Sequence, residues 1–264
     1  MRVLLTKVFL LFVFVQLLAL SIGTIFTAQA ISVVENPAST DNSFYFFGII
    51  ILFAVILLVI LKYYHGKLLF QILELAMQFT AVQILANNFV NELIATGIAL
   101  VTIAVRLKWK ETKQFFLLIT VAVVGALLGA SLDVLPGAIL AILLSTYDVI
   151  AVFYTKHMVT LAKKLTKQEG AFSIKVQEKK EKLELGTGDL VIPAMLIVSA
   201  NKIGVKIIET QFGWLTSPSL AALIGACIGI AALLVFLEKH KGYWPALPPI
   251  TIGTLIGIGI VSLF

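Results

Sequence analysis

Apolar runs long enough to cross a lipid bilayer recur along the whole chain, and this feature limits its fold more than any other. A helix rises about 1.5 Å per residue, so about 20 apolar residues cross a hydrocarbon layer about 30 Å thick. Backbone polar groups must find partners within such a layer, which restricts these runs to helices. The composition agrees, because 60% of the 264 residues are hydrophobic, against about 45–50% in soluble domains. The sequence therefore predicts an all-α polytopic membrane protein.

The apolar runs predict nine transmembrane helices and leave no room for a soluble domain between them. The third and fourth runs are the least distinct, because asparagines and Glu92 crowd the turn between them. Three glycine pairs with a spacing of four predict close helix contacts, namely Gly125/Gly129, Gly225/Gly229 and Gly253/Gly257. The predicted spans are 4–30, 43–64, 67–87, 90–107, 113–131, 134–157, 187–207, 218–238 and 245–263.

The first span has some features of a secretory signal. Arg2 and Lys7 precede its long apolar run, and Ala28-Gln29-Ala30 resembles a signal-peptidase site. Its apolar stretch from Val8 to Phe26 is longer than the apolar part of a typical signal peptide. We therefore expect it to remain as a transmembrane helix.

The basic residues predict the orientation. Eighteen of the 20 fall in connections on one side of the predicted bundle, and only Lys202 and Lys206 fall on the other. Basic residues concentrate on the cytoplasmic side, where the membrane surface is anionic. The expected N-terminus is cytoplasmic and the C-terminus lies outside. The net charge of +6 is thus attributed to interaction with anionic membrane lipids, and no nucleic-acid partner is expected. The lysine-rich connector at about 158–185 is expected to be a mobile or partly helical cytoplasmic loop.

Two of the four aspartates lie within predicted spans. Asp41 and Asp133 fall in outer loops, whereas Asp148 and Asp189 fall in spans six and seven. A carboxylate at depth in lipid is unfavourable and usually carries function. Asp148 lies near the cytoplasmic end of span six, and Asp189 lies near the cytoplasmic start of span seven. Both carboxylates are therefore expected in the cytoplasmic half, where they could share one proton.

The residues before Asp189 favour an irregular start to span seven. Gly186 and Gly188 flank Thr187, and glycine admits positive φ and lets another main chain approach closely. The alternation Lys182-Leu183-Glu184-Leu185 is consistent with a strand edge that could pair with an extended substrate. In span nine, Pro245-Ala246-Leu247-Pro248-Pro249 contains three prolines in five residues, which disfavour regular helix and leave main-chain groups free.

These motifs resemble those of the presenilin and signal peptide peptidase family. The matching residues are Tyr147-Asp148 in span six, Gly-x-Gly-Asp at 186–189 in span seven and Pro-Ala-Leu at 245–247 in span nine. The stretch from Tyr147 to Val152, followed by Lys156-His157-Met158, looks like the archaeal presenilin homologues. One departure is Thr187, where leucine is common in the family.

The resemblance implies an intramembrane aspartic endopeptidase, with Asp148 and Asp189 as the catalytic pair. It further implies that Tyr147, Gly186, Thr187, Gly188, Pro245, Ala246 and Leu247 support the site and the substrate. The whole chain, 1–264, would form one protease domain: spans one to six at about 4–157, the connector, and spans seven to nine at about 187–263.

Substrates would be transmembrane segments of membrane proteins or remnant signal peptides. No cofactor or metal is expected, and no obligate accessory subunit, because the connector lacks the long insert of animal presenilins. A homo-oligomer is left open, and a multi-pass protein of the cell membrane is expected.

Other classes fit the sequence less well. Neither His-Glu-x-x-His nor Gly-x-Ser-x-Gly occurs, which argues against zinc and serine intramembrane proteases. Prepilin-type peptidases also use Gly-x-Gly-Asp, but usually have fewer spans. A proton-coupled transporter or ion channel stays open as an alternative, since the aspartates with Glu74 and Gln78 could form a relay. Glu74 is more readily explained as a structural polar contact.

Overall fold

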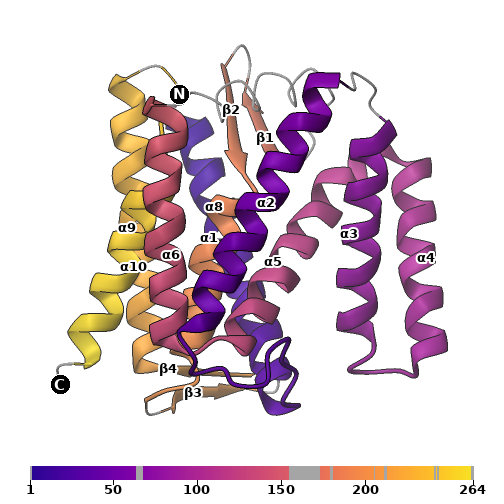
Figure 1. Cartoon of the computed structure of the whole chain (residues 1–264), viewed down its shortest axis with the longest axis horizontal. Helices are drawn as coiled ribbons and strands as arrows, with labels where there is room; N and C mark the ends of the chain where they lie inside the picture. The colour runs from indigo at the N-terminus through magenta and orange to yellow at the C-terminus, as the bar shows by residue number, and fades with distance from the viewer. Residues whose placement is uncertain are drawn as a thin grey trace.

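The structure of the protein, a computed structural model, describes residues 2–63, 68–154, 173–178, 181–204, 206–210, 213–240, 242 and 244–262. Nine α-helices occur in this described part of the chain (Figure 1). They are α1 (Arg2–Ala28), α2 (Asp41–Tyr63), α3 (Leu68–Ala86), α4 (Glu92–Lys108), α5 (Lys113–Ser131), α6 (Val134–Val149), α8 (Gly188–Ala200), α9 (Ser217–Lys239) and α10 (Leu247–Ser262).

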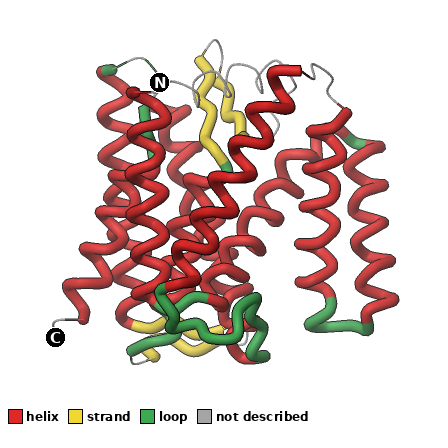
Figure 2. The backbone as a smooth tube through the Cα atoms, in the orientation of Figure 1, coloured by secondary structure: helices red, strands yellow, loops and turns green. Residues whose placement is uncertain are grey.

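The helices run between the two ends of the molecule, where the loops and strands gather (Figure 2). The N-terminus lies at one end and the C-terminus at the other (Figure 1). Six helices are long and apolar enough to cross a membrane, the α6 span being counted through Tyr154, while α8 and α10 are shorter apolar helices. Each of the nine predicted spans therefore contains one helix, and the polytopic helical membrane fold is confirmed.

Span seven is shorter than predicted. The expected helix at 187–207 ends at Ala200, after 13 residues. Such a helix is about 20 Å long, which is less than the hydrocarbon thickness. The chain then turns at 201–204 and forms β3 (Lys206–Thr210), which pairs with β4 (Gly213–Thr216) in an antiparallel hairpin. The prediction was wrong here because Ile203 of the turn and Ile207 of β3 are apolar and were assigned to the preceding helix.

The connector before span seven is also ordered differently from the prediction. Its described parts form β1 (Ser173–Glu178) and β2 (Glu181–Gly186), not a mobile or partly helical loop. The two strands are antiparallel, with Ser173 opposite Gly186 and Val176 opposite Leu183. The predicted strand at 182–185 is confirmed, although its partner in the structure is β1. The residues 158–172 and 179–180 of the connector lie outside the described part.

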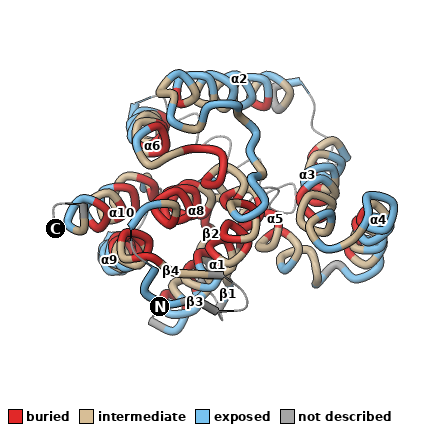
Figure 3. The backbone as a smooth tube through the Cα atoms, turned by 90° about the horizontal axis from the view of Figure 1, so that it is seen from below, coloured by how far each residue is buried: buried red, intermediate tan, exposed pale blue. Residues whose placement is uncertain are grey.

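The core surrounds α8. Buried residues gather on α8, α1, α5, α9 and α10, whereas α2, α3 and α4 lie at the periphery (Figure 3). On α1, Phe12, Val15, Ala19 and Phe26 are fully buried, so this helix belongs to the packed bundle. The outer helices expose large apolar side chains, as expected of surfaces that face lipid; Leu52 on α2 is 60% exposed.

The predicted glycine contacts are present. A Cβ added at Gly125 of α5 would lie 2.7 Å from the Ala194 Cβ of α8, closer than real Cβ atoms approach. Gly129 likewise faces the Met195 carbonyl of α8, and Gly225 and Gly253 lie against each other's backbone between α9 and α10. Small residues thus let these backbones touch, which is the usual basis of helix association in lipid.

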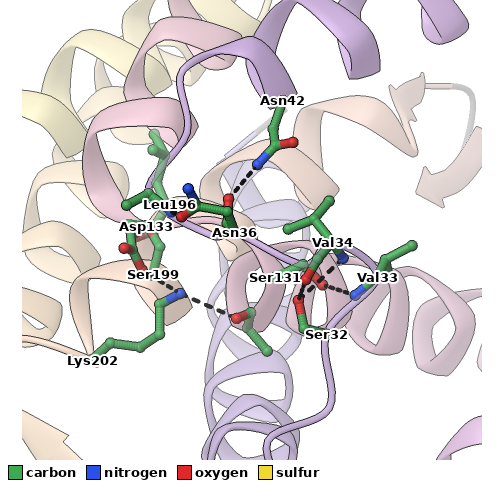
Figure 4. Close-up of polar contacts among 12 residues, drawn as sticks. Ser32, Val33, Val34, Asn36, Asn42, Ser131, Asp133, Leu196, Ser199 and Lys202 are labelled. Atoms are coloured by element: carbon green, nitrogen blue, oxygen red, sulfur yellow. Dashed lines mark hydrogen bonds and ion pairs between the residues drawn. The ribbon is translucent and has the colours of Figure 1, made fainter.

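Polar contacts tie the loops together at the end opposite the N-terminus (Figure 4). The Lys202 Nζ atom, just beyond α8, lies 2.9 Å from Asp133 Oδ1 at the α5–α6 turn, and also donates to the Ala130 carbonyl. The Val33 amide donates to Ser131 Oγ at 2.9 Å, which attaches the loop after α1 to the end of α5. The two outer residues expected on one side, Asp133 and Lys202, are therefore neighbours.

A buried ion cluster joins α3, α4 and α5. The Glu74 carboxylate is paired with Arg106 and lies 3.1 Å from Lys113 Nζ, while its side chain is only 1% exposed. Arg106 Nη1 also donates to Gln78 Oε1 at 2.8 Å. Glu74 is therefore a structural contact, as expected, and its carboxylate is engaged by cations.

Removing the Glu74 carboxylate should destabilise the bundle. Glu74→Ala leaves Arg106 buried without its counter-charge, which typically costs about 3–5 kcal/mol. The measurement is the unfolding temperature of purified protein in detergent. Glu92→Ala, at the exposed start of α4, serves as the control. Equal unfolding temperatures for the two variants would contradict this account of the cluster.

Candidate active site

Asp148 lies on the last turn of α6. The α-helix ends at Val149 and continues as a π-helical turn, η2 (Ile150–Tyr154). Single π-turns within helices are frequent at functional sites, because they redirect side chains. Asp148 and its neighbour Tyr147 are both half-buried, so the carboxylate is neither in bulk water nor sealed in the core.

Asp189 is the second residue of α8, and only Thr187 separates this helix from β2. The strand leads from the N-terminal end of the bundle down into α8 (Figure 1). Because of this strand, α8 begins below the helix ends around it, and its first carboxylate lies inside the bundle. The predicted irregular start of span seven is present as a strand-to-helix junction.

The glycines of the 186–189 motif act through space and not through backbone conformation. Neither has a positive φ; among the described glycines only Gly204 and Gly242 do. The positive φ that glycine admits is therefore not used at Gly186 or Gly188. The Gly186 amide donates to the Asp189 carboxylate, and a Cβ added at Gly186 would lie 3.1 Å from Asp189 Oδ2. Beside Gly188 an added Cβ would meet no atom within 4 Å.

The two aspartates come together. Asp189 and Asp148 interact electrostatically across the α6–α8 interface. No cation in the described part of the chain pairs with either carboxylate. Two carboxyl groups in such a position favour a state in which they hold one proton between them.

The Pro-Ala-Leu element lies against Asp148. The Leu247 amide, at the start of α10, donates to Asp148 Oδ2 at 3.4 Å. Ala246 and Leu247 are buried, at 8% and 6% exposure. Pro248 and Pro249 have no N–H, so the first turn of α10 presents the Leu247 amide almost alone. The structure thus places all three predicted motifs at one site.

Two features of the site were not predicted from the sequence. The η2 turn leaves no signal in the residues that form it. Gln16 on α1 is fully buried, and its Nε2 donates to the Leu190 carbonyl at 3.3 Å, next to Asp189. A glutamine within an apolar span could have been flagged from the sequence as a polar contact.

An apolar cavity of about 290 Å³ borders the Pro-Ala-Leu element. Its lining residues come from η2, α9, the segment before α10 and the first turn of α10, and include Phe153, Phe236, Trp244, Pro245 and Pro249. Thr187 lines a second, narrow cavity of about 40 Å³ together with Glu74 and Val191. In the described part of the chain, no three His, Cys, Asp or Glu side chains gather as metal ligands would.

Comparison with known proteins agrees with this geometry. Residues 9–264 match the family model described as signal-peptide peptidase, presenilin aspartyl protease. A solved structure of a presenilin family intramembrane aspartate protease in a C222 crystal is similar, with 26% identity, a TM-score of 0.72, and coverage of 98% of this chain and 99% of the other. A structure of such a protease in a P2 crystal has 27% identity, a TM-score of 0.67, and coverage of 97% and 96%.

No curated protein sequence matches the chain closely enough to count as a relative. The family match nevertheless extends over nearly the full length, and it includes all three motifs of the site. The chain belongs to the signal-peptide peptidase and presenilin aspartyl protease family.

Proposed function

We propose that this protein is an intramembrane aspartic endopeptidase in which Asp148 and Asp189 form the catalytic pair. The observation that carries the proposal is the meeting of these two carboxylates inside a membrane bundle, with no described cation beside them. The family and the two similar proteases support the same reaction class. The transporter alternative is not favoured by them.

The reaction follows from one shared proton. The charged carboxylate takes a proton from a water molecule, and the oxygen of that water attacks the scissile carbonyl carbon. The neutral carboxyl group donates its proton to the carbonyl oxygen, giving a tetrahedral diol. The diol collapses as the C–N bond breaks and the nitrogen takes up a proton, which releases the amine and restores the shared proton.

The supporting residues would act by positioning the two carboxylates and the substrate. Leu247 would orient Asp148 through its amide, with Pro245 and Ala246 holding that segment against the site. Gly186 would orient Asp189 through its amide. Tyr147 lies beside Asp148 and interacts with it electrostatically. The half-buried Thr187 lies between the glycines and, through its cavity, would influence substrate preference.

The substrate would be a transmembrane segment that unwinds before cleavage. Its main chain could lie in the open space beside Gly188. β2 has β1 as its partner in the described part of the chain, and its other edge could pair with an extended substrate. Transmembrane segments of membrane proteins and remnant signal peptides fit this requirement. The protease would act as one domain over the whole chain, without an obligate accessory subunit.

We further infer that all nine helices cross the membrane, with the N-terminus cytoplasmic. The ends of the chain lie at opposite ends of the bundle (Figure 1), which an odd number of crossings requires. Most basic residues fall in connections on the N-terminal side, which supports a cytoplasmic assignment for that side and a place in the cell membrane.

Loss of either carboxylate should abolish cleavage. Asp148→Asn and Asp189→Asn keep the side-chain shape but remove the shared proton, so the rate should fall by at least about 10³-fold. The assay is mass spectrometry of products from a labelled transmembrane peptide incubated with purified protein. Asp41→Asn, at the exposed start of α2, is the matched control and should cleave normally. Undiminished cleavage by either site variant would rule out the catalytic pair.

Substitution of the two motif glycines should impair cleavage for different reasons. Gly186→Ala places a Cβ 3.1 Å from Asp189 Oδ2, so it should displace the carboxylate and lower kcat. Gly188→Ala meets no protein atom within 4 Å, so it should leave the unfolding temperature unchanged and raise KM by filling space meant for substrate. Steady-state kinetics with a transmembrane peptide separate the two effects. Normal kinetics for Gly188→Ala would show that substrate does not use this space.

A further inference from the structure

One hydrogen bond between side chains crosses the interface of α6 and α10. Ser145 Oγ donates to Thr251 Oγ1 at 2.9 Å, and both residues are buried, at 8% and 2% exposure. Nothing in the mechanism above uses these hydroxyl groups. A buried polar pair in an apolar interface raises the question of what it holds in place.

The pair lies one helical turn from the contact between Leu247 and Asp148. Ser145 precedes Asp148 by three residues on α6, and Thr251 follows Leu247 by four residues on α10. Residues three and four apart share a helix face. Two hydrogen bonds therefore join the same faces of the same two helices, one between side chains and one between the Leu247 amide and the Asp148 carboxylate.

The second of these bonds depends on accurate placement. Its length of 3.4 Å is at the long end of the normal range, so a small slip between the helices would break it. The start of α10 has few amides of its own to set its position, because Pro248 and Pro249 supply none. A contact one turn further along α10 can therefore set the position of Leu247.

Apolar packing alone is poorly suited to this task. Leu144 and Ile250, which precede the two hydroxyl residues, are buried and apolar. Apolar side chains gain little by meeting each other when the alternative is lipid, and they tolerate sliding. A hydroxyl–hydroxyl hydrogen bond has a narrow range of length and angle, so it selects one register.

We propose that Ser145 and Thr251 are positioning residues that hold the Pro-Ala-Leu segment against Asp148 by fixing the register of α6 and α10. The inference rests on the proposed catalytic role of Asp148. It assigns the pair no contact with substrate; its effect passes through the amide of Leu247.

The matched variants for the test occur on the same helices. Ser145→Ala and Thr251→Val each remove one hydroxyl with little change in volume. Thr146→Val is the control on α6, because the Thr146 hydroxyl bonds to the Ile142 carbonyl of its own helix. Thr254→Val is the control on α10, because the buried Thr254 hydroxyl bonds to the Ile250 carbonyl of its own helix.

The measurement is kcat and KM for a labelled transmembrane peptide with purified full-length variants. Hydrogen bonds between membrane helices have strengths that correspond to about a 3- to 20-fold change. Ser145→Ala and Thr251→Val should each lower kcat by about that factor with KM nearly unchanged, since orientation acts at the reacting centre. The double variant should be no slower than the slower single variant, and Thr251→Ser, which keeps the hydroxyl, should restore the rate.

Three results would overturn the inference: rates equal to those of Thr146→Val and Thr254→Val, additive losses in the double variant, or a change in KM alone. Asp148→Asn is run in parallel. If it still cleaves, the proposed function itself fails; if it is inactive while the hydroxyl variants behave as the controls do, only the positioning role fails. Unfolding temperatures identify a misfolded variant, and if Thr251→Val does not fold, Ser145→Ala against Thr146→Val decides the question.

Discussion

The close approach of α8 to its neighbours determines where the site can form. Gly125 and Gly129 of α5 let the α8 backbone come into contact near Ala194 and Met195. This helix is buried on nearly every side, since Leu190 and all its residues from Ile192 to Ala200 are buried. Lipid provides no hydrophobic force to bring helices together, so such contact depends on small residues and shape. Asp189, at the start of this central helix, takes its position from that packing.

The shortness of α8 links the fold to the chemistry. A helix of full membrane length would begin at the surface and place its second residue in water. Here β2 enters the bundle first, and its pairing with β1 satisfies main-chain groups that would otherwise be unpaired near lipid. The carboxylate therefore lies inside the protein, next to an extended main chain. A protease that cuts within the membrane needs both, because its substrate must be extended and must meet water there.

The buried acidic residues have two different surroundings. Glu74 is held by Arg106 and Lys113, whose charged groups fix its carboxylate between α3, α4 and α5. Asp148 faces Asp189 and accepts a hydrogen bond from the Leu247 amide. A carboxylate neutralised by cations holds helices together, whereas two carboxylates facing each other can pass a proton. The difference between a structural and a reactive acid therefore lies in the neighbour and not in the residue type.

The sequence alone determined the helical membrane class, the presence of one helix in each predicted span, and the three motifs with their order, because apolar length, charge and local spacing are properties of neighbouring residues. It also indicated the strand at 182–185. It missed the end of α8 at Ala200, the β-hairpins on either side of it, the π-helical turn η2 and the bond between Ser145 and Thr251. Hydropathy cannot separate an apolar strand from a helix end, and contacts between residues about a hundred positions apart leave no local pattern. Only the tertiary structure decided that Asp148, Asp189 and Leu247 meet, because that depends on how α6, α8 and α10 pack.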